Sequence, residues 1–280
     1  MKHIGKISII LAIVMIVSYG ISATLLNEET FTMDEAMSVH QEMNSQAGTT
    51  LLIESVSSDV ELIHSEDGVR AVLNGTSTLP EEKQPKLHIE EGEEIHIWIE
   101  YPHVWMIGHQ NTDLTVYAPL HEETTITTVS GEVKAKELRK CSISTTSGDV
   151  ELSDTTKTCS ITSVSGDIQI GKSEQIQVKT TSGDIEIENA HDAIDVTSIS
   201  GEVEANYAQF TGNNKITTTS GDVEITTPYD ASFSIDIKTI SGKITTSKGF
   251  TMTAFDENHI KGETNGGEHM LKIKTISGSV

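Results

Sequence analysis

Apolar residues recur along this chain two positions apart on either side of a Ser-Gly dipeptide. In one repeat, Ile143 precedes Ser147 by four positions, and Val150 and Leu152 follow it by three and five. A spacing of two places alternate side chains on one face of a strand, whereas a helix needs spacings of three and four, which are absent here. Each unit is therefore predicted to be a short strand, a Ser-Gly corner, a second short strand and a variable return loop.

The Ser-Gly corner recurs through the second half of the chain. Successive corner glycines are 17, 18, 17, 18, 20, 21 and finally 36 residues apart, the last gap being about two repeats; they are Gly131, Gly148, Gly166, Gly183, Gly201, Gly221, Gly242 and Gly278. So short and regular a period is typical of a solenoid, in which like residues stack from coil to coil about 4.8 Å apart. The sequence therefore predicts an all-β fold, a parallel β-solenoid with 17–21-residue coils, over residues 50–280.

Two parts of this domain are expected to differ. The pattern appears once early, around Ser57-Ser58, so the first coil is expected there with Ser58 in place of glycine. Residues 50–123 are otherwise irregular and are expected to form a wider end that closes the open sheet edge. Residues 124–280 are expected to form regular coils with an interruption at 247–270, and to end in an uncapped edge strand.

The N-terminal segment does not follow the repeat. Lys2 and Lys6 precede a mostly apolar stretch, residues 7–26, which is long enough to span a bilayer as a helix. The charge bias places residues 1–6 in the cytoplasm and the solenoid outside it. The alternative is a cleaved signal peptide with Ile21-Ser22-Ala23 as its cleavage site.

Between this segment and the solenoid, residues 27–49 are polar and show no clear period. We expect them to form a stalk with some helix.

Composition narrows the class of protein. Aromatic residues make up 4% of the chain, which fits a thin stacked core better than a thick globular one. The formal net charge is −23, and Arg70 and Arg139 are the only arginines. So acidic a surface disfavours nucleic acid as a partner and favours cations or basic proteins, although it also simply keeps an exposed protein soluble.

The recurring Ser-Gly-Asp-Val units, the early Ser57-Ser58-Asp59-Val60 copy and the lead-in at residues 114–119 resemble the bacterial putative-adhesin family of β-strand-repeat cell-envelope proteins. The resemblance covers roughly residues 48–280. It implies the repeat fold and a place in the cell envelope, and it implies little chemistry. This chain departs from the pattern at Ser58 and where Lys243 and Ser279 replace the acid.

An acidic residue follows most corner glycines, and these residues form one column of like charge. Stacked carboxylates could bind calcium, with Asp149, Asp167, Asp184 and Asp222 as candidate ligands. Turn chemistry is the simpler interpretation, because glycine permits positive φ and Ser and Asp side chains bond nearby backbone N–H groups. No cofactor is expected.

Cys141 and Cys159 both lie six residues before a corner serine, 18 residues apart. They are therefore expected in one column on adjacent coils, within reach of a disulfide. Two reduced thiols that fill core positions are the alternative.

The residue just before each corner serine is β-branched. Strand alternation turns this column outward, so Val129, Val164, Ile199, Ile240 and Ile276 are candidates for a binding stripe on the surface. Strand propensity alone would also favour such residues.

These observations favour a non-catalytic, membrane-anchored extracytoplasmic solenoid that binds an envelope or surface partner, as an adhesin-like or sensing module. No catalytic grouping stands out, because the repeat spreads the acids evenly and arginine is almost absent. A structural solenoid that assembles end to end is the alternative, and a carbohydrate-active enzyme is the third possibility.

Overall fold

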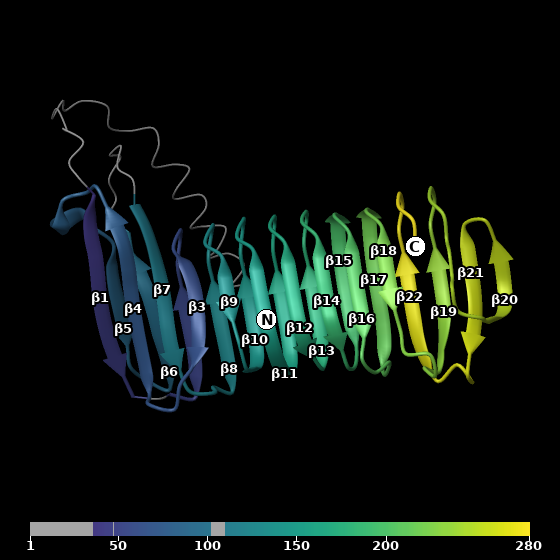
Figure 1. Ribbon diagram of the computed structural model, residues 1–280, viewed down its shortest axis with the longest axis horizontal. Coiled ribbons are helices and arrows are strands. Elements are labelled where there is room, and N and C mark those ends of the chain that lie inside the picture. Colours follow the sequence, from purple (N-terminus) through teal and green to yellow (C-terminus); the bar gives the residue numbers. More distant parts are fainter. Residues whose placement is uncertain (1–35, 47, 102–109) are drawn as a thin grey trace, which may run out of the picture. The chain divides into compact units, whose positions relative to one another are not determined.

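The computed structural model describes residues 36–46, 48–101 and 110–280. These residues form a β-solenoid in which two sheets face each other along a shared apolar interior (Figure 1). Its only helical element in these ranges is the short 3-10 turn η2, Glu81–Lys83. The expected all-β fold is confirmed. The expected membrane span at 7–26 lies outside the described residues, and none of the helical structure within them is long and apolar enough to cross a bilayer.

The strand before each corner belongs to one sheet, which we call sheet B. Its spatial order is β5 (Lys86–Glu90), β6 (Glu94–Glu100), β2 (Thr50–Glu54), β8 (Glu123–Thr127), β10 (Leu138–Ser144), β11 (Val150–Thr162), β13 (Gln175–Lys179), β15 (Ile194–Ser200), β17 (Asn213–Ser220), β22 (His269–Lys274), β19 (Phe233–Lys238), β21 (His259–Thr264) and β20 (Thr251–Asp256). All neighbouring strands from β6 to β19 are parallel, so the stacked coils make up the middle of sheet B, and antiparallel strands stand at its two ends.

The strand after each corner belongs to sheet A. Its order is β1 (Met37–Ser45), β4 (Val69–Ser77), β7 (Gln110–Ala118), β3 (Asp59–His64), β9 (Val133–Ala135), β11, β12 (Ile168–Ser173), β14 (Ile185–Ala190), β16 (Val203–Tyr207) and β18 (Val223–Thr226). β11 contributes to both sheets, since residues 150–154 pair in sheet A and residues 158–162 in sheet B.

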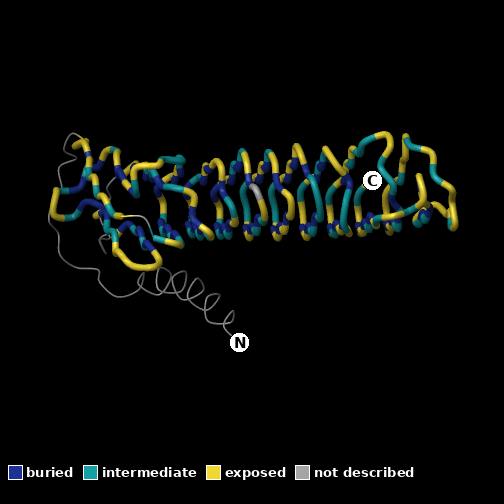
Figure 2. The backbone as a smooth tube through the Cα atoms, turned by 90° about the horizontal axis from the view of Figure 1, so that it is seen from below, coloured by how far each residue is buried: buried dark blue, intermediate teal, exposed yellow. Residues whose placement is uncertain are grey.

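The core consists of stacked columns, as the repeat predicts. Ile143 lies in register with Ile126 on one side and Ile161 on the other, and all three are buried. Residues two before each corner serine also point inward, although they are Thr or Ser. Most of their hydroxyls are hydrogen-bonded within the corner: Thr145 accepts from the N–H of Gly148, and Thr180 donates to the carbonyl of Ser182. The buried hydroxyls of Thr218 and Thr275 have no hydrogen-bond partner in the described structure. Figure 2 shows the resulting pattern of buried and exposed positions along the coils.

The N-terminal end includes one strand that the sequence did not predict. Residues 37–45 fall within the expected stalk, but they form β1, which pairs antiparallel with β4. From β1, the Gln41 side chain donates to the Pro85 carbonyl at 2.7 Å and accepts from the Leu87 N–H at 2.8 Å. This amide therefore joins sheet A to β5 of sheet B, and this part of the stalk prediction is wrong.

The first corner explains why Ser58 replaces glycine. A Cβ on Gly131 would lie 1.9 Å from the Ser58 carbonyl oxygen of the coil before it, so stacked corners cannot carry a side chain. Where a preceding corner would lie, Ser58 contacts the Tyr101 side chain, and the two hydroxyls are 2.8 Å apart. Space for the serine side chain therefore exists at this corner.

The C-terminal end also departs from expectation. β22 lies between β17 and β19, parallel to both, so it is an interior strand rather than an uncapped edge. The 36-residue gap contains no second regular coil; it contains the β20–β21 hairpin, after which the chain returns to insert β22. The prediction of an uncapped edge strand was wrong because the repeat spacing assumes that coils stack in chain order, whereas the hairpin lies within the expected interruption at 247–270.

Candidate functional site

The corners stack into a continuous ridge between the two sheets. Each corner serine donates its backbone N–H to the residue before the serine of the preceding coil, as Ser147 does to Val129 and Ser182 to Val164, both at 2.9 Å. The serine hydroxyls reach the same carbonyls, at 3.3 Å for Ser147 and 3.4 Å for Ser182. These bonds fix the residue before each serine at the surface of the ridge.

We call this column of residues the corner row. In stacking order its members are Val129, Thr146, Val164, Thr181, Ile199, Thr219, Ile276 and Ile240. Val164, Ile199 and Ile276 are each about half exposed, Ile240 is 70% exposed, and Val129 is half-buried. The expected outward orientation of this stripe is therefore confirmed. Because β22 is inserted before β19, Ile276 and Ile240 lie on adjacent coils, whereas threonines separate the apolar members elsewhere.

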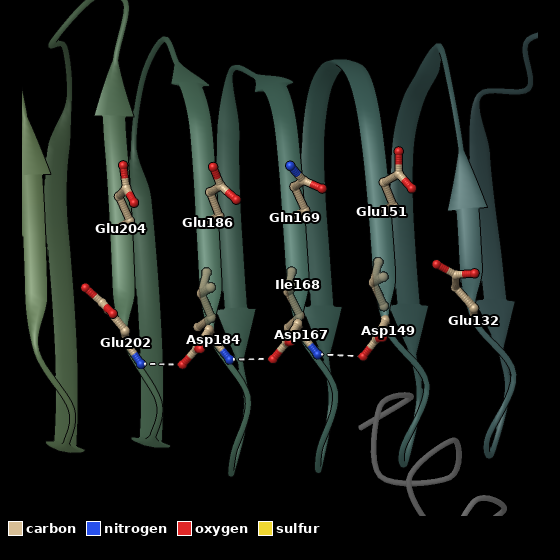
Figure 3. Close-up of a pocket in the computed structure, with 12 residues that line it drawn as sticks. Glu132, Asp149, Glu151, Asp167, Ile168, Gln169, Asp184, Glu186, Glu202 and Glu204 are labelled. Atoms are coloured by element: carbon tan, nitrogen blue, oxygen red, sulfur yellow. Dashed lines mark hydrogen bonds between the residues drawn. The ribbon is translucent and has the colours of Figure 1, made fainter.

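The acid column follows the corner on the sheet A side, and its aspartates bond to the next coil. Oδ1 of Asp149 accepts the backbone N–H of Asp167 at 2.8 Å, and Oδ1 of Asp167 accepts that of Asp184 at 2.9 Å (Figure 3). Asp184 bonds in the same way to Glu202, and Asp59 to Glu132. The turn interpretation of this column is therefore supported by direct contacts.

Glutamates at the same position behave differently. The Glu132 carboxylate instead pairs with Lys134 at 3.0 Å, and Glu132 is the main reason that the pKa of Lys134 is raised. At the N-terminal end of the column, burial raises the pKa of Asp113, and the Asp59 carboxylate beside it adds to the effect. The extra methylene of glutamate moves its carboxylate away from the next coil's N–H.

A shallow groove of about 470 Å³ runs over the outer face of sheet A beside the corners (Figure 3). Its lining combines the residues directly after the glycines, those two positions further on and three of the apolar residues between them: Glu132, Asp149, Val150, Glu151, Asp167, Ile168, Gln169, Asp184, Ile185, Glu186, Glu202 and Glu204. Eight of these twelve residues are acidic. The sequence signal for this groove was present, since an acid often recurs two positions after the first, but only the column nearest the corner was singled out.

The expected calcium ligands do not converge. Asp149, Asp167 and Asp184 each belong to a different coil and direct an oxygen at backbone, and Asp222 does the same toward the N–H of Ser279 at 2.7 Å. Across the described ranges, no group of three or more His, Cys, Asp or Glu side chains is placed to hold a metal ion.

The two cysteines lie in register on adjacent coils, as their spacing predicts. Cys141 in β10 is the direct neighbour of Cys159 in β11, and both are buried free thiols. The hydrogen bond that the Cys159 thiol makes with Cys141, together with burial, raises the pKa of the Cys159 thiol well above its usual value. A thiol in its protonated form is a poor nucleophile.

The N-terminal end carries an aromatic cluster that sequence reasoning did not find. The Trp98 ring lies between His88, stacked at 5.0 Å, and His96, at 4.6 Å, on the outer face of sheet B. His88 contacts Glu100 at 3.0 Å and His96 contacts Glu54 at 2.7 Å. With both histidines occupied by carboxylates, this cluster ties β2, β5 and β6 together.

Two solved structures are similar to this chain, and the first of them supports the fold. A putative adhesin from Bacteroides fragilis NCTC 9343 superposes with a TM-score of 0.51 at 10% identity, over 87% of this chain and 95% of the other. A putative lipid binding protein from Parabacteroides distasonis ATCC 8503 gives 0.44 at 15% identity, over 85% and 96%. No curated protein matches the sequence. The sequence itself matches the Toastrack DUF4097 family over residues 49–280. The chain therefore belongs to the Toastrack DUF4097 family.

Proposed function

We propose that this chain is a non-catalytic, membrane-anchored binding module on the outer side of the cytoplasmic membrane, of the adhesin-like or envelope-sensing kind. Residues 7–26 would hold it to the bilayer, and the solenoid would present the corner row to a partner in the envelope or on another surface. The similar structure from Bacteroides fragilis, whose description is that of a putative adhesin, supports this class of function.

The corner row is the observation that carries the proposal. Val164 and Ile199 expose about half of their surface on a ridge whose corner serines are hydrogen-bonded from coil to coil. The acidic groove runs three residues further along each coil, so a partner that contacts both would need apolar groups beside basic or neutral ones. Nucleic acid does not fit this description, because its phosphates would face the carboxylates.

The carboxylates themselves support binding rather than catalysis. They recur once per coil along the column, and the aspartates are engaged with backbone N–H groups. General acid–base chemistry instead needs a pair of groups whose environments separate their pKa values at one place in the fold.

The test is binding of the full chain to isolated cell envelopes, with Val164→Thr and Ile199→Thr combined in one variant. Threonine keeps the β-branched shape and removes the apolar surface, so we expect the fold to persist and co-sedimentation to fall at least about fivefold, the equivalent of about 1 kcal/mol. Leu120→Thr with Tyr229→Thr is the matched control, because both residues are exposed but lie outside the corner row.

A second test uses intact cells that make the full chain and from which the wall has been removed. Protease added to these cells should degrade the solenoid. Full protection from protease would contradict the extracytoplasmic location. Undiminished co-sedimentation of the folded corner-row variant would contradict the binding surface.

A further inference from the structure

At its C-terminal end the solenoid is open, because sheet B continues beyond sheet A. Beyond β18, sheet A has only short backbone pairings. In these the Val280 N–H donates to the Lys243 carbonyl, and the Thr245 N–H donates to the Val280 carbonyl. The β20–β21 hairpin continues sheet B past this point, at the far end of the solenoid from β1 (Figure 1). No described strand of sheet A lies opposite the hairpin.

The face of β20 that this leaves uncovered is apolar. Phe255 pairs with Ile260, and Met252 pairs with Gly262. Directly opposite residues of an antiparallel pair share a face, and Ile260 and Gly262 are both buried toward the core. Met252 and Phe255 therefore lie on the core side of the sheet, yet they are 40% and 75% exposed.

The outer edge of β20 is also free in the described structure. Its six residues include neither proline nor lysine, the residues that commonly protect such an edge. A bulge at Thr253, on the side that pairs with β21, is its main irregularity. The opposite end of the solenoid differs, because Gln41 of β1 is bonded to the backbone around β5.

The distribution of charged side chains indicates which kind of partner can approach the C-terminal end. Residues 36–237 contain 34 acidic and 11 basic side chains, whereas residues 238–280 contain four Asp or Glu and six Lys. Two copies that meet through their C-terminal ends therefore avoid the acidic surface that would repel them elsewhere.

We propose that the exposed edge of β20 binds a second copy of this chain, by antiparallel pairing of the two β20 strands about a two-fold axis. The centre of β20 lies between Thr253 and Ala254, so this pairing sets Met252 of one chain opposite Phe255 of the other. Sheet B then runs through both molecules, and the apolar residues of each open end cover those of its neighbour. Such an interface is isologous and closes at a dimer.

The experiment measures the mass of the purified full chain in detergent by sedimentation over a wide concentration range, with Phe255→Lys as the test variant. We expect the wild type to form a dimer and the variant to raise the dissociation constant more than about tenfold, since a lysine cannot be buried in this contact without loss. Tyr229→Lys is the matched control, because Tyr229 is 94% exposed but lies in the loop before β19. Circular dichroism and thermal melting confirm that each variant is folded.

Cysteine cross-linking gives a second measurement that does not depend on a disruptive substitution. Thr253→Cys and Ala254→Cys lie next to the two-fold axis, and each should give a disulfide-linked dimer on a non-reducing gel. Tyr229→Cys and the wild type, whose two thiols are buried, should not. A wild type that stays monomeric, an open series of oligomers, or a Phe255→Lys variant that dimerises normally would each overturn the proposal.

Discussion

Each corner glycine lies against the backbone of the coil before it, and this contact accounts for the repeat more fully than backbone conformation does. Gly131 and Gly148 do not have positive φ, yet a Cβ on either would lie 1.9 Å from a carbonyl oxygen. Gly166 and Gly183 have φ values of 118° and 111° in addition. A single repeat unit indicates only the conformational reason for glycine, because close approach between coils is a property of the stacked structure.

Gly183→Ala tests this contact. The added methyl would meet the Gly166 carbonyl oxygen at 2.1 Å and would also sit at an unfavourable φ. We expect the free energy of unfolding to fall by about 2–4 kcal/mol, measured by urea titration.

Gly249→Ala is the control, since nothing lies within 4 Å of its added Cβ and its φ is ordinary. Equal effects at the two positions would show that loss of glycine flexibility, rather than the steric contact, governs stability.

His121 adds a pH dependence at the residue scale. Burial lowers its pKa from the usual 6.5, despite a hydrogen bond to the Pro119 backbone, and its Nε2 atom has no partner in the described structure. Because the unfolded state then binds a proton more readily than the folded state, stability falls as the pH drops through about 6.5 and below.

We expect the thermal midpoint of the wild type to fall more between pH 7.5 and pH 5.5, the range spanning the ordinary pKa of about 6.5, than that of a His121→Gln variant. Differential scanning calorimetry of both proteins across this range makes the comparison. Parallel pH profiles would show that other groups are responsible.

At the scale of elements, β22 connects the C-terminal hairpin to the rest of the solenoid. Ile273 is buried between Ile216 of β17 and Ile237 of β19. Three residues later, Ile276 belongs to the exposed corner row. The same residue type thus occupies a core position and a surface position within one corner.

Ile273→Ala should cost about 2–5 kcal/mol locally, because it leaves a cavity between two strands, whereas Ile276→Ala should cost less than about 0.5 kcal/mol. Hydrogen exchange measured by mass spectrometry distinguishes the two. In the first variant, protection should be lost in residues 233–274 and retained in the coils before β18. Uniform loss along the chain would mean that the solenoid unfolds as a single cooperative unit.

At the scale of the whole molecule, the sequence predicted what repeats and failed where the repeat is interrupted. Offsets from the corner serine placed Ile143, Cys141, Cys159 and Val164 correctly, because a stacked coil fixes each position relative to its neighbours. The strand β1 was missed since its burial pattern is weak and its partner, β4, lies about 30 residues away along the chain.

The candidate site was predicted in the same uneven way. The corner row follows from alternation within one strand, and the exposed residues agree with it. The groove depends on two neighbouring columns in sheet A, and the open end depends on where sheet A stops relative to sheet B. Such relations join residues from different coils, and a single repeat unit does not contain them.

The position of β22 also has a consequence for biosynthesis. β19 leaves the ribosome 36 residues ahead of β22, a delay of a few seconds at about 5–20 residues per second. During that interval the edge of β17 is vacant, and β19 carries the same alternating apolar residues as the strand that eventually occupies it. The nascent chain therefore has a competing register in which β19 pairs directly with β17, and the final order forms only if the edge of β17 stays open for β22 or β22 displaces β19 from it.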